Sequence, residues 1–203
     1  LIVGSGISAA GLLYEGAAVT LNGGSLTLAG NASGSNGGSA TLSGTALTLN
    51  SANQEDRWTV RDTSLSGSST LTKTGNGTVT LSGTHTANGT WNINAGTLVF
   101  TGTRDITGGG QINIASGAVL DASGGRLFHA ANYASNWEQP TITLNGGTLK
   151  LNQFGYNSAS LGCLQNNFYA LKFSSGTTSR VIISQGYESG GTGHLQFFRV
   201  EPD

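Results

Sequence analysis

Ten carboxylates are the first side chains that could carry out chemistry in this 203-residue chain. Glycoside hydrolases need two carboxyl groups that flank the scissile bond, about 5 to 9 Å apart. Among the regularly spaced strand positions defined below, only Asp121 is acidic, and the equivalent positions of its neighbours hold no second acid. A β-helical polysaccharide lyase or glycoside hydrolase is therefore the weakest of three functional hypotheses, and the sequence assigns no catalytic residue.

A dense charged cluster surrounds Trp58 and consists of Glu55, Asp56, Arg57, Arg61 and Asp62. One interpretation is a ligand-facing loop with the indole ring as a platform. The other, which we favour, is a loop held by ion pairs with the indole covering the core.

Aromatic and amide side chains gather in two segments, residues 126–139 and 152–169. Aromatic rings stack on the C–H faces of sugars, while amides and carboxylates bond to hydroxyl groups. Insertions in repeat proteins also tend to map to one binding face. The sequence therefore predicts a glycan site formed by Tyr133, Trp137, Glu138, Phe154, Tyr156 and Tyr169. The alternative is that these aromatic rings cover an open edge of the core.

The three histidines, His85, His129 and His194, lie far apart in the sequence and show no metal-ligand spacing. We therefore expect a surface or hydrogen-bonded histidine at each position and no metal site. Glycine doublets such as Gly23-Gly24 lack the strand-to-helix context of a phosphate loop, so they indicate corners. No cofactor is expected.

Composition excludes several protein classes. Charged residues make up only 9% of the chain and the net charge is −1, which argues against nucleic-acid partners. No apolar run is long enough to span a bilayer as a helix. Gly, Thr, Ser and Asn make up almost half of the chain, which disfavours helices. Disorder is disfavoured because 36% of the residues are hydrophobic and regularly spaced.

One spacing recurs along the chain, as in Val19-Thr20-Leu21, a glycine pair, and Leu26-Thr27-Leu28. We call this spacing the template: apolar residues at offsets 0, +2, +7 and +9, with glycine between the two pairs. Copies begin at residues 19, 40, 71, 91, 112, 142 and 171. The intervals are about 20 or about 30 residues, as expected for one coil length with insertions of about ten residues.

Physically, the template describes two short strands with a glycine corner between them. Such a unit cannot bury its apolar face alone, whereas stacked copies bury it as one column. The sequence predicts an all-β, single-stranded parallel β-helix (β-solenoid) with about seven coils of 20–30 residues. Outward residues should form a ladder with steps of about 4.8 Å, namely Thr20, Thr41, Thr72, Asn92, Asn113 and Thr143. A β-meander would also alternate, but it would not explain the fixed offsets.

We expect one domain over residues 1–203, with an N-terminal edge at 1–18 and regular coils over 19–151. Those coils carry insertions at 51–70 and 122–140, and irregular C-terminal coils follow over 152–203.

The segment of residues 71–98 reads LTKTGNGTVTLSGTHTANGTWNINAGTL. It resembles the autotransporter-associated β-strand repeat, also called the passenger-associated transport repeat, whose pattern is close to LTKtGaGTLtLsGaNtYtGgTtinaGtL. Departures are Ala87, where the family usually has Tyr, and the triplet Asn88-Gly89-Thr90 in place of a Gly-Gly step. The rest of the chain shares the period but not the motif.

The resemblance implies a right-handed β-helical segment of a secreted or surface-exposed bacterial protein, associated with the outer membrane, with no catalytic residues to carry over. The sequence contains no β-barrel translocator of the kind that the family carries, so we expect a fragment of a longer protein. Leu1-Ile2-Val3-Gly4 begins without Met and without a basic region, so we expect that it is not a signal peptide. Expected partners are the rest of that polypeptide and host or environmental glycans. The predicted role is a structural or adhesive stalk; the alternatives are a carbohydrate-binding module and, more weakly, a glycan-degrading enzyme.

Overall fold

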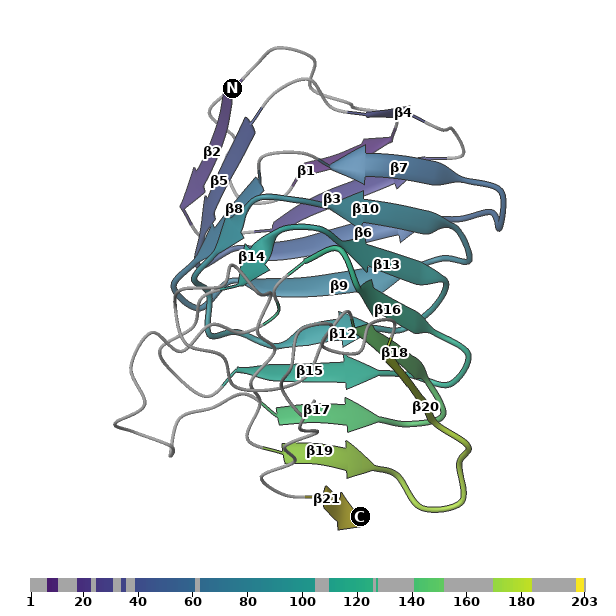
Figure 1. Cartoon of the computed structure of the whole chain (residues 1–203). Coiled ribbons are helices and arrows are strands. Elements are labelled where there is room, and N and C mark those ends of the chain that lie inside the picture. Colours follow the sequence, from purple (N-terminus) through teal and green to yellow (C-terminus); the bar gives the residue numbers. More distant parts are fainter. Residues whose placement is uncertain are drawn as a thin grey trace, which may run out of the picture.

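Parallel strands stack one above another along a single axis (Figure 1). The computed structural model describes residues 7–10, 18–22, 25–30, 34–35, 39–60, 63–104, 110–125, 127, 141–151, 170–183 and 200–202. None of these residues is helical, so none belongs to a helix that could cross a membrane. Every strand pairing among them is parallel, which excludes the β-meander, whose neighbouring strands are antiparallel.

The largest sheet, sheet 1, runs the whole length of the stack and has β1 at one end and β21 at the other (Figure 1). Its nine strands are, in spatial order, β1 (Ile7–Ala10), β3 (Ser25–Gly30), β6 (Ala46–Ser51), β9 (Thr70–Thr74), β12 (Trp91–Ile93), β15 (Gln111–Ile114), β17 (Thr141–Leu144), β19 (Ala170–Phe173) and β21 (Val200–Pro202). The strands of sheet 1 lie in space in the order of the sequence, and strands of other sheets come between them along the chain, as stacked coils require.

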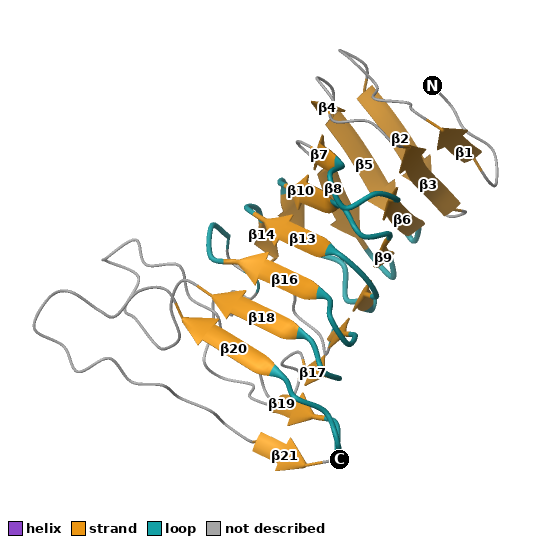
Figure 2. Ribbon diagram, turned by 90° about the vertical axis from the view of Figure 1, so that its right-hand side faces the viewer, coloured by secondary structure: helices purple, strands orange, loops and turns teal. Residues whose placement is uncertain are grey.

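Sheet 2 forms a second face, and Figure 2 shows its strands one after another along the stack. Its seven strands are, in order, β4 (Gly34–Ser35), β7 (Arg57–Val60), β10 (Thr78–Leu81), β13 (Thr97–Phe100), β16 (Val119–Ala122), β18 (Thr148–Leu151) and β20 (Arg180–Ile183). From β6 to β20, each strand of sheet 1 is followed in the chain by a strand of sheet 2.

The remaining strands make a third face. Sheet 3 contains β2 (Ala18–Asn22), β5 (Ser39–Ser43) and β8 (Thr63–Ser66), and sheet 4 contains β11 (Thr84–His85) and β14 (Thr103–Arg104). The amides of Thr86 and Ala87 donate to the carbonyl of Leu65, at 2.8 and 3.0 Å, and so join β11 to β8. Between β6 and β14 the chain therefore passes sheet 1, sheet 2 and the third face in turn.

The core is a continuous apolar column between the sheets. In strands such as β9, β10, β13 and β15, alternate residues point inward, and their side chains are almost completely buried. Burying one such aliphatic side chain contributes about 1.5 to 3 kcal/mol relative to leaving it exposed. On sheet 1 the column contains Leu47, Leu49, Leu71, Trp91, Ile93, Ile112, Ile114, Ile142, Leu144 and Leu171, and on sheet 2 it contains Val60, Val79, Leu81, Leu98, Phe100, Leu120, Ala122, Leu149 and Leu151.

The predicted ladder of outward residues is partly wrong. Thr72, Asn92, Asn113 and Thr143 are register neighbours on sheet 1, and Asn113 Nδ2 donates to Asn92 Oδ1 at 2.9 Å. Thr20 and Thr41 instead pair with each other and with Ser64 on sheet 3. Their places on sheet 1 are taken by Thr27 and Thr48.

The error has a physical cause, because strand–glycine–strand units occur at two of the three corners of a coil. The first two template copies describe the corner from sheet 3 to sheet 1, and the later copies describe the corner from sheet 1 to sheet 2. Both corners carry the same residue pattern.

The insertion predicted at 51–70 contributes β7 to sheet 2 and β8 to sheet 3. The segments predicted as the insertion 122–140 and the irregular C-terminal coils are described at β16, β19, β20 and β21. Handedness and the number of coils stay predictions.

Candidate functional site

The six residues of the predicted glycan site lie outside the described residues: Tyr133, Trp137, Glu138, Phe154, Tyr156 and Tyr169. The strands that flank their segments are described. One segment leaves β16 and returns at β17, and the next leaves β18 and returns at β19. Ala122 is the register partner of Leu151, and Thr141 is the partner of Ala170. Both segments therefore depart from neighbouring residues of sheet 2 and return to neighbouring residues of sheet 1.

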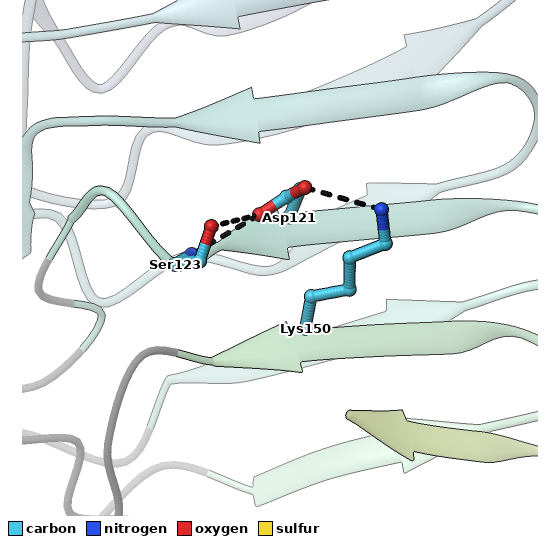
Figure 3. Close-up of polar contacts among 3 residues, drawn as sticks. All are labelled: Asp121, Ser123 and Lys150. Carbon is cyan, nitrogen blue, oxygen red and sulfur yellow. Dashed lines mark hydrogen bonds and ion pairs between the residues drawn. The ribbon is translucent and has the colours of Figure 1, made fainter. Parts of the chain in front are cut away.

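Asp121, the one acidic residue at a template strand position, lies on the outer face of sheet 2 (Figure 3). Lys150 is its register partner on β18, with Nζ 3.3 Å from Asp121 Oδ2. The Ser123 hydroxyl donates to Asp121 Oδ1 at 2.6 Å, and the Ser123 amide donates to the same oxygen at 3.2 Å. The structure thus brings together three polar residues from two adjacent coils.

Opposing influences act on the Asp121 carboxyl. Partial burial is the largest, and it raises the pKa. The hydrogen bonds from Ser123 and the ammonium of Lys150 outweigh it, so that the pKa lies below its ordinary value. A carboxylate held in its ionised form is a weak proton acceptor at neutral pH. The cluster is suited to joining two strands electrostatically.

The strand neighbours of Asp121 are Val99 on β13 and Lys150 on β18. Neither is a carboxyl group, so the register forms no glycosidase-type acid pair at this position. Among the described residues, no three His, Cys, Asp or Glu side chains gather as a metal site requires.

The charged cluster near Trp58 is described in part. Asp56 is only 2% exposed, and its Oδ2 accepts the Asn53 amide at 2.9 Å. Arg57 Nη1 donates to the carbonyls of Gln54 and Asp56, at 2.6 and 2.8 Å. These two charged side chains therefore bind the backbone of their own turn, and both interpretations of the loop stay predictions. The side chain of Trp58 and residues Arg61 and Asp62 lie outside the described part.

His85 lies in the core, whereas His129 and His194 fall outside the described residues. The ring centroid of His85 lies 5.4 Å from that of Trp91, and these two rings are perpendicular. It lies 5.5 Å from the ring centroid of Phe100. Trp91 and Phe100 are also perpendicular, at 5.3 Å. Edge-to-face geometry of this kind stabilises aromatic clusters beyond simple burial.

Sequence reasoning missed Lys73. This residue takes the inward +2 offset of the template copy that begins at Leu71, and it is fully buried. Its ammonium donates to the carbonyls of Thr74, Gly75 and Ala95. The available signal was a lysine at a position where the other copies carry apolar residues.

Comparison with known proteins gives one positive result. Residues 71–100 match the family model of the passenger-associated-transport repeat. The predicted resemblance is thereby confirmed for this segment, which extends from β9 through β13 and includes Lys73, His85, Trp91 and Phe100. The repeat implies a secreted or surface protein in general. Searches of curated proteins and of solved structures found no match.

The passenger-associated-transport repeat therefore coincides with an ordinary stretch of the stack. Its strands continue sheets 1 and 2: β9 pairs with β6 before it, and β13 pairs with β16 after it. The repeat is an integral part of a longer solenoid.

Proposed function

We propose that this chain is a non-catalytic stalk segment of a bacterial surface protein of the autotransporter passenger type, with a structural or adhesive role. The observation that carries the proposal is the match to the passenger-associated-transport repeat within a stack that continues on both sides of it. A stack of this kind supplies length and resistance to proteases through backbone ladders and a dry core.

We further propose that the helix is right-handed. A crossover between parallel strands of one sheet is right-handed in about 98% of known cases. Successive strands of sheet 1 are parallel, and the chain between them passes through the other sheets, so each connection is a crossover between parallel strands of one sheet.

Surface display tests the stalk function. The complete 203-residue chain is placed between a secretion signal and an autotransporter barrel in a Gram-negative host, and intact cells are treated with trypsin. We expect the chain to reach the surface and to resist trypsin. The matched control is Gly96→Val, because a Cβ at this position would meet backbone of the preceding coil. Retention of the chain inside the cell, or digestion as rapid as that of the control, contradicts the proposal.

A second candidate function is glycan binding by the aromatic segments. It is favoured by the neighbouring departure and return points of the two segments on sheets 1 and 2. A glycan array compares the wild type with Trp137→Ala and Tyr156→Ala. Retention of a glycan by the wild type, with loss of at least tenfold in either variant, supports an adhesive role. If the wild type retains no glycan, the role is structural alone.

A further inference from the structure

Lys73 is a cation inside an apolar column. Its register neighbours on sheet 1 are Leu49 on β6 and Ile93 on β12, and all three side chains are buried. An apolar residue therefore fits the same place in the coils before and after. A buried ammonium needs a specific compensation from its surroundings.

That compensation comes from backbone oxygens at the corner between sheets 1 and 2. Lys73 Nζ lies 2.7 Å from the carbonyl oxygen of Thr74, 2.8 Å from that of Gly75 and 3.2 Å from that of Ala95. The Thr74 oxygen lies at the end of β9 and the Gly75 oxygen in the corner that follows, whereas the Ala95 oxygen belongs to the corner of the next coil. An ammonium has three donors, so these contacts use all of them.

Backbones lie unusually close together at these corners. A Cβ on Gly75, which has a φ of 71°, would overlap the carbonyl of Ser51 in the preceding coil. A Cβ on Gly96 would lie 2.5 Å from the Gly75 oxygen and nearer still to that of Gly77. The carbonyl oxygens thus crowd together, and a positive charge among them offsets their mutual repulsion.

The ammonium is costly to keep at this position. Burial lowers the pKa of Lys73 to about 8, which measures how strongly the interior disfavours the charged form. A leucine would fill the same space without that cost. The benefit must therefore lie in the geometry that the charge imposes, since buried charged groups can specify one arrangement without adding net stability.

We propose that the carbonyl oxygens of Thr74, Gly75 and Ala95 form a cation site, which Lys73 fills with its own ammonium group. The filled site fixes how the corner after β9 is aligned with the corner of the next coil. Two corners in consecutive coils are tied to one cation, so the passenger-associated-transport repeat carries its own register marker. This inference concerns the fold of the repeat, and it stands or fails independently of the proposed stalk function.

Nitrogen NMR of the wild-type chain tests whether the site is filled. The sequence has three lysines, Lys73, Lys150 and Lys172, so their Nζ signals are readily assigned. We expect Lys73 alone to show slowly exchanging ammonium protons at pH 7, with scalar couplings to carbonyl carbons. Exchange of the Lys73 protons as fast as that of Lys150, whose side chain is 40% exposed, overturns the proposal even if no variant folds.

Hydrogen exchange tests the control of register. The amides of Gly77 and Thr97 donate to the carbonyls of Ser51 and Gly77, at 3.0 and 3.1 Å, and report on the two corners. In Lys73→Met we expect both amides to exchange at least tenfold faster than in the wild type. The matched control is Ile93→Met, which changes the neighbouring inward residue and leaves the cation in place. Exchange within twofold of the wild type in Lys73→Met overturns the proposal.

Chemical rescue identifies the cation as the active element. Lys73→Ala removes three carbons and the ammonium nitrogen, and propylammonium consists of the same chain with the same charge. Propylammonium should restore the protection of Gly77 and Thr97, whereas 1-propanol, which has one donor and no charge, and tetramethylammonium, which has charge and no donor, should not. Equal protection by 1-propanol and propylammonium would mean that the cavity requires only filling, and the cation site would then be refuted.

Discussion

The coils of residues 70–104, which we call the early coils, and those of residues 110–183, the late coils, share sheets 1 and 2 but differ on the third face. In the early coils, β11 and β14 close each turn, and about 20 residues separate the register partners Leu71 and Trp91. In the late coils, the described residues add no strand to the third face, and about 30 residues separate Ile112 from Ile142.

The interiors differ as well. The interiors of the early coils include Lys73, with its three carbonyl acceptors, and the ring of Trp91, which is edge-on to the rings of His85 and Phe100. Among the described residues of the late coils, the buried hydrophobic side chains are aliphatic. In the part of the chain that the structure describes, interior polar and aromatic contacts therefore accompany the short coils, and aliphatic side chains fill the interior of the longer coils.

Corner glycines with positive φ show the same contrast. Gly75, Gly83 and Gly96 in the early coils lie against carbonyls of the preceding coil, so that a Cβ would overlap backbone. Around Gly117 and Gly176 in the late coils, nothing lies within 4 Å of a Cβ, and Gly146 meets only Ser116, at 3.0 Å. At the corners with positive φ, the backbones of the early coils, which contain the matched repeat, therefore lie closer together than those of the late coils.

The largest expected effect comes from a pair of alanine substitutions at equivalent corners. Gly96→Ala should lower the free energy of unfolding by about 3 kcal/mol or more, because backbone clash adds to the cost of a left-handed alanine. Gly117→Ala should cost only the left-handed conformation, about 1 to 2 kcal/mol. Urea unfolding of both variants measures the difference. Equal losses would remove the contrast between the early and late coils.

The next effect is the pH dependence that Lys73 gives to the early coils. Its folded pKa of about 8 lies below the ordinary 10.5, so the unfolded chain binds more protons between these values. The free energy of unfolding of the wild type, relative to Lys73→Met, should therefore rise as the pH increases from about 8 to about 10.5. The full rise should be at most about 3 kcal/mol. A difference that stays flat, or that falls over this range, would contradict the lowered pKa of Lys73.

The smallest effect concerns the outer face of the late coils. Asp121→Asn should lower the free energy of unfolding by less than about 1 kcal/mol at pH 7, because the ion pair with Lys150 is partly exposed. The folded pKa of Asp121 is depressed, so its contribution exists above the ordinary value of 3.8. The difference between wild type and variant should therefore disappear as the pH falls through the lower, folded value. A loss above about 2 kcal/mol would mean that the late coils also depend on specific polar contacts.

The sequence predicts the stacked strands well where alternation and a glycine corner occur together. Leu71, Ile93, Ile112 and Leu149 have the expected inward positions, because alternation along a strand determines which face a side chain takes. The resemblance of residues 71–98 to the passenger-associated transport repeat also agrees with the family match.

The third face of the early coils could not be predicted, because β11 and β14 are only two residues long. The assignment of Thr20 and Thr41 to the wrong ladder has the same origin, since a two-strand template contains no third corner. The partnership of Asp121 with Lys150 could not be predicted from the template, because Asp121 takes offset +9 of its copy and Lys150 takes offset +8. The cation site that Lys73 fills depends on the positions of backbone carbonyls in two coils, and no spacing of residue types specifies those positions.

Distances along sheet 1 test the central claim, that the chain is one continuous parallel stack. In a Cys163→Ser background, spin labels are placed at Thr27 and, in turn, at Asn92, Thr143 and Lys172, which lie three, five and six strands away. With about 4.8 Å between strands, double electron–electron resonance should give distances of about 14, 24 and 29 Å. Distances that do not increase in this order, or a Thr27 to Lys172 distance under about 20 Å, would contradict the account.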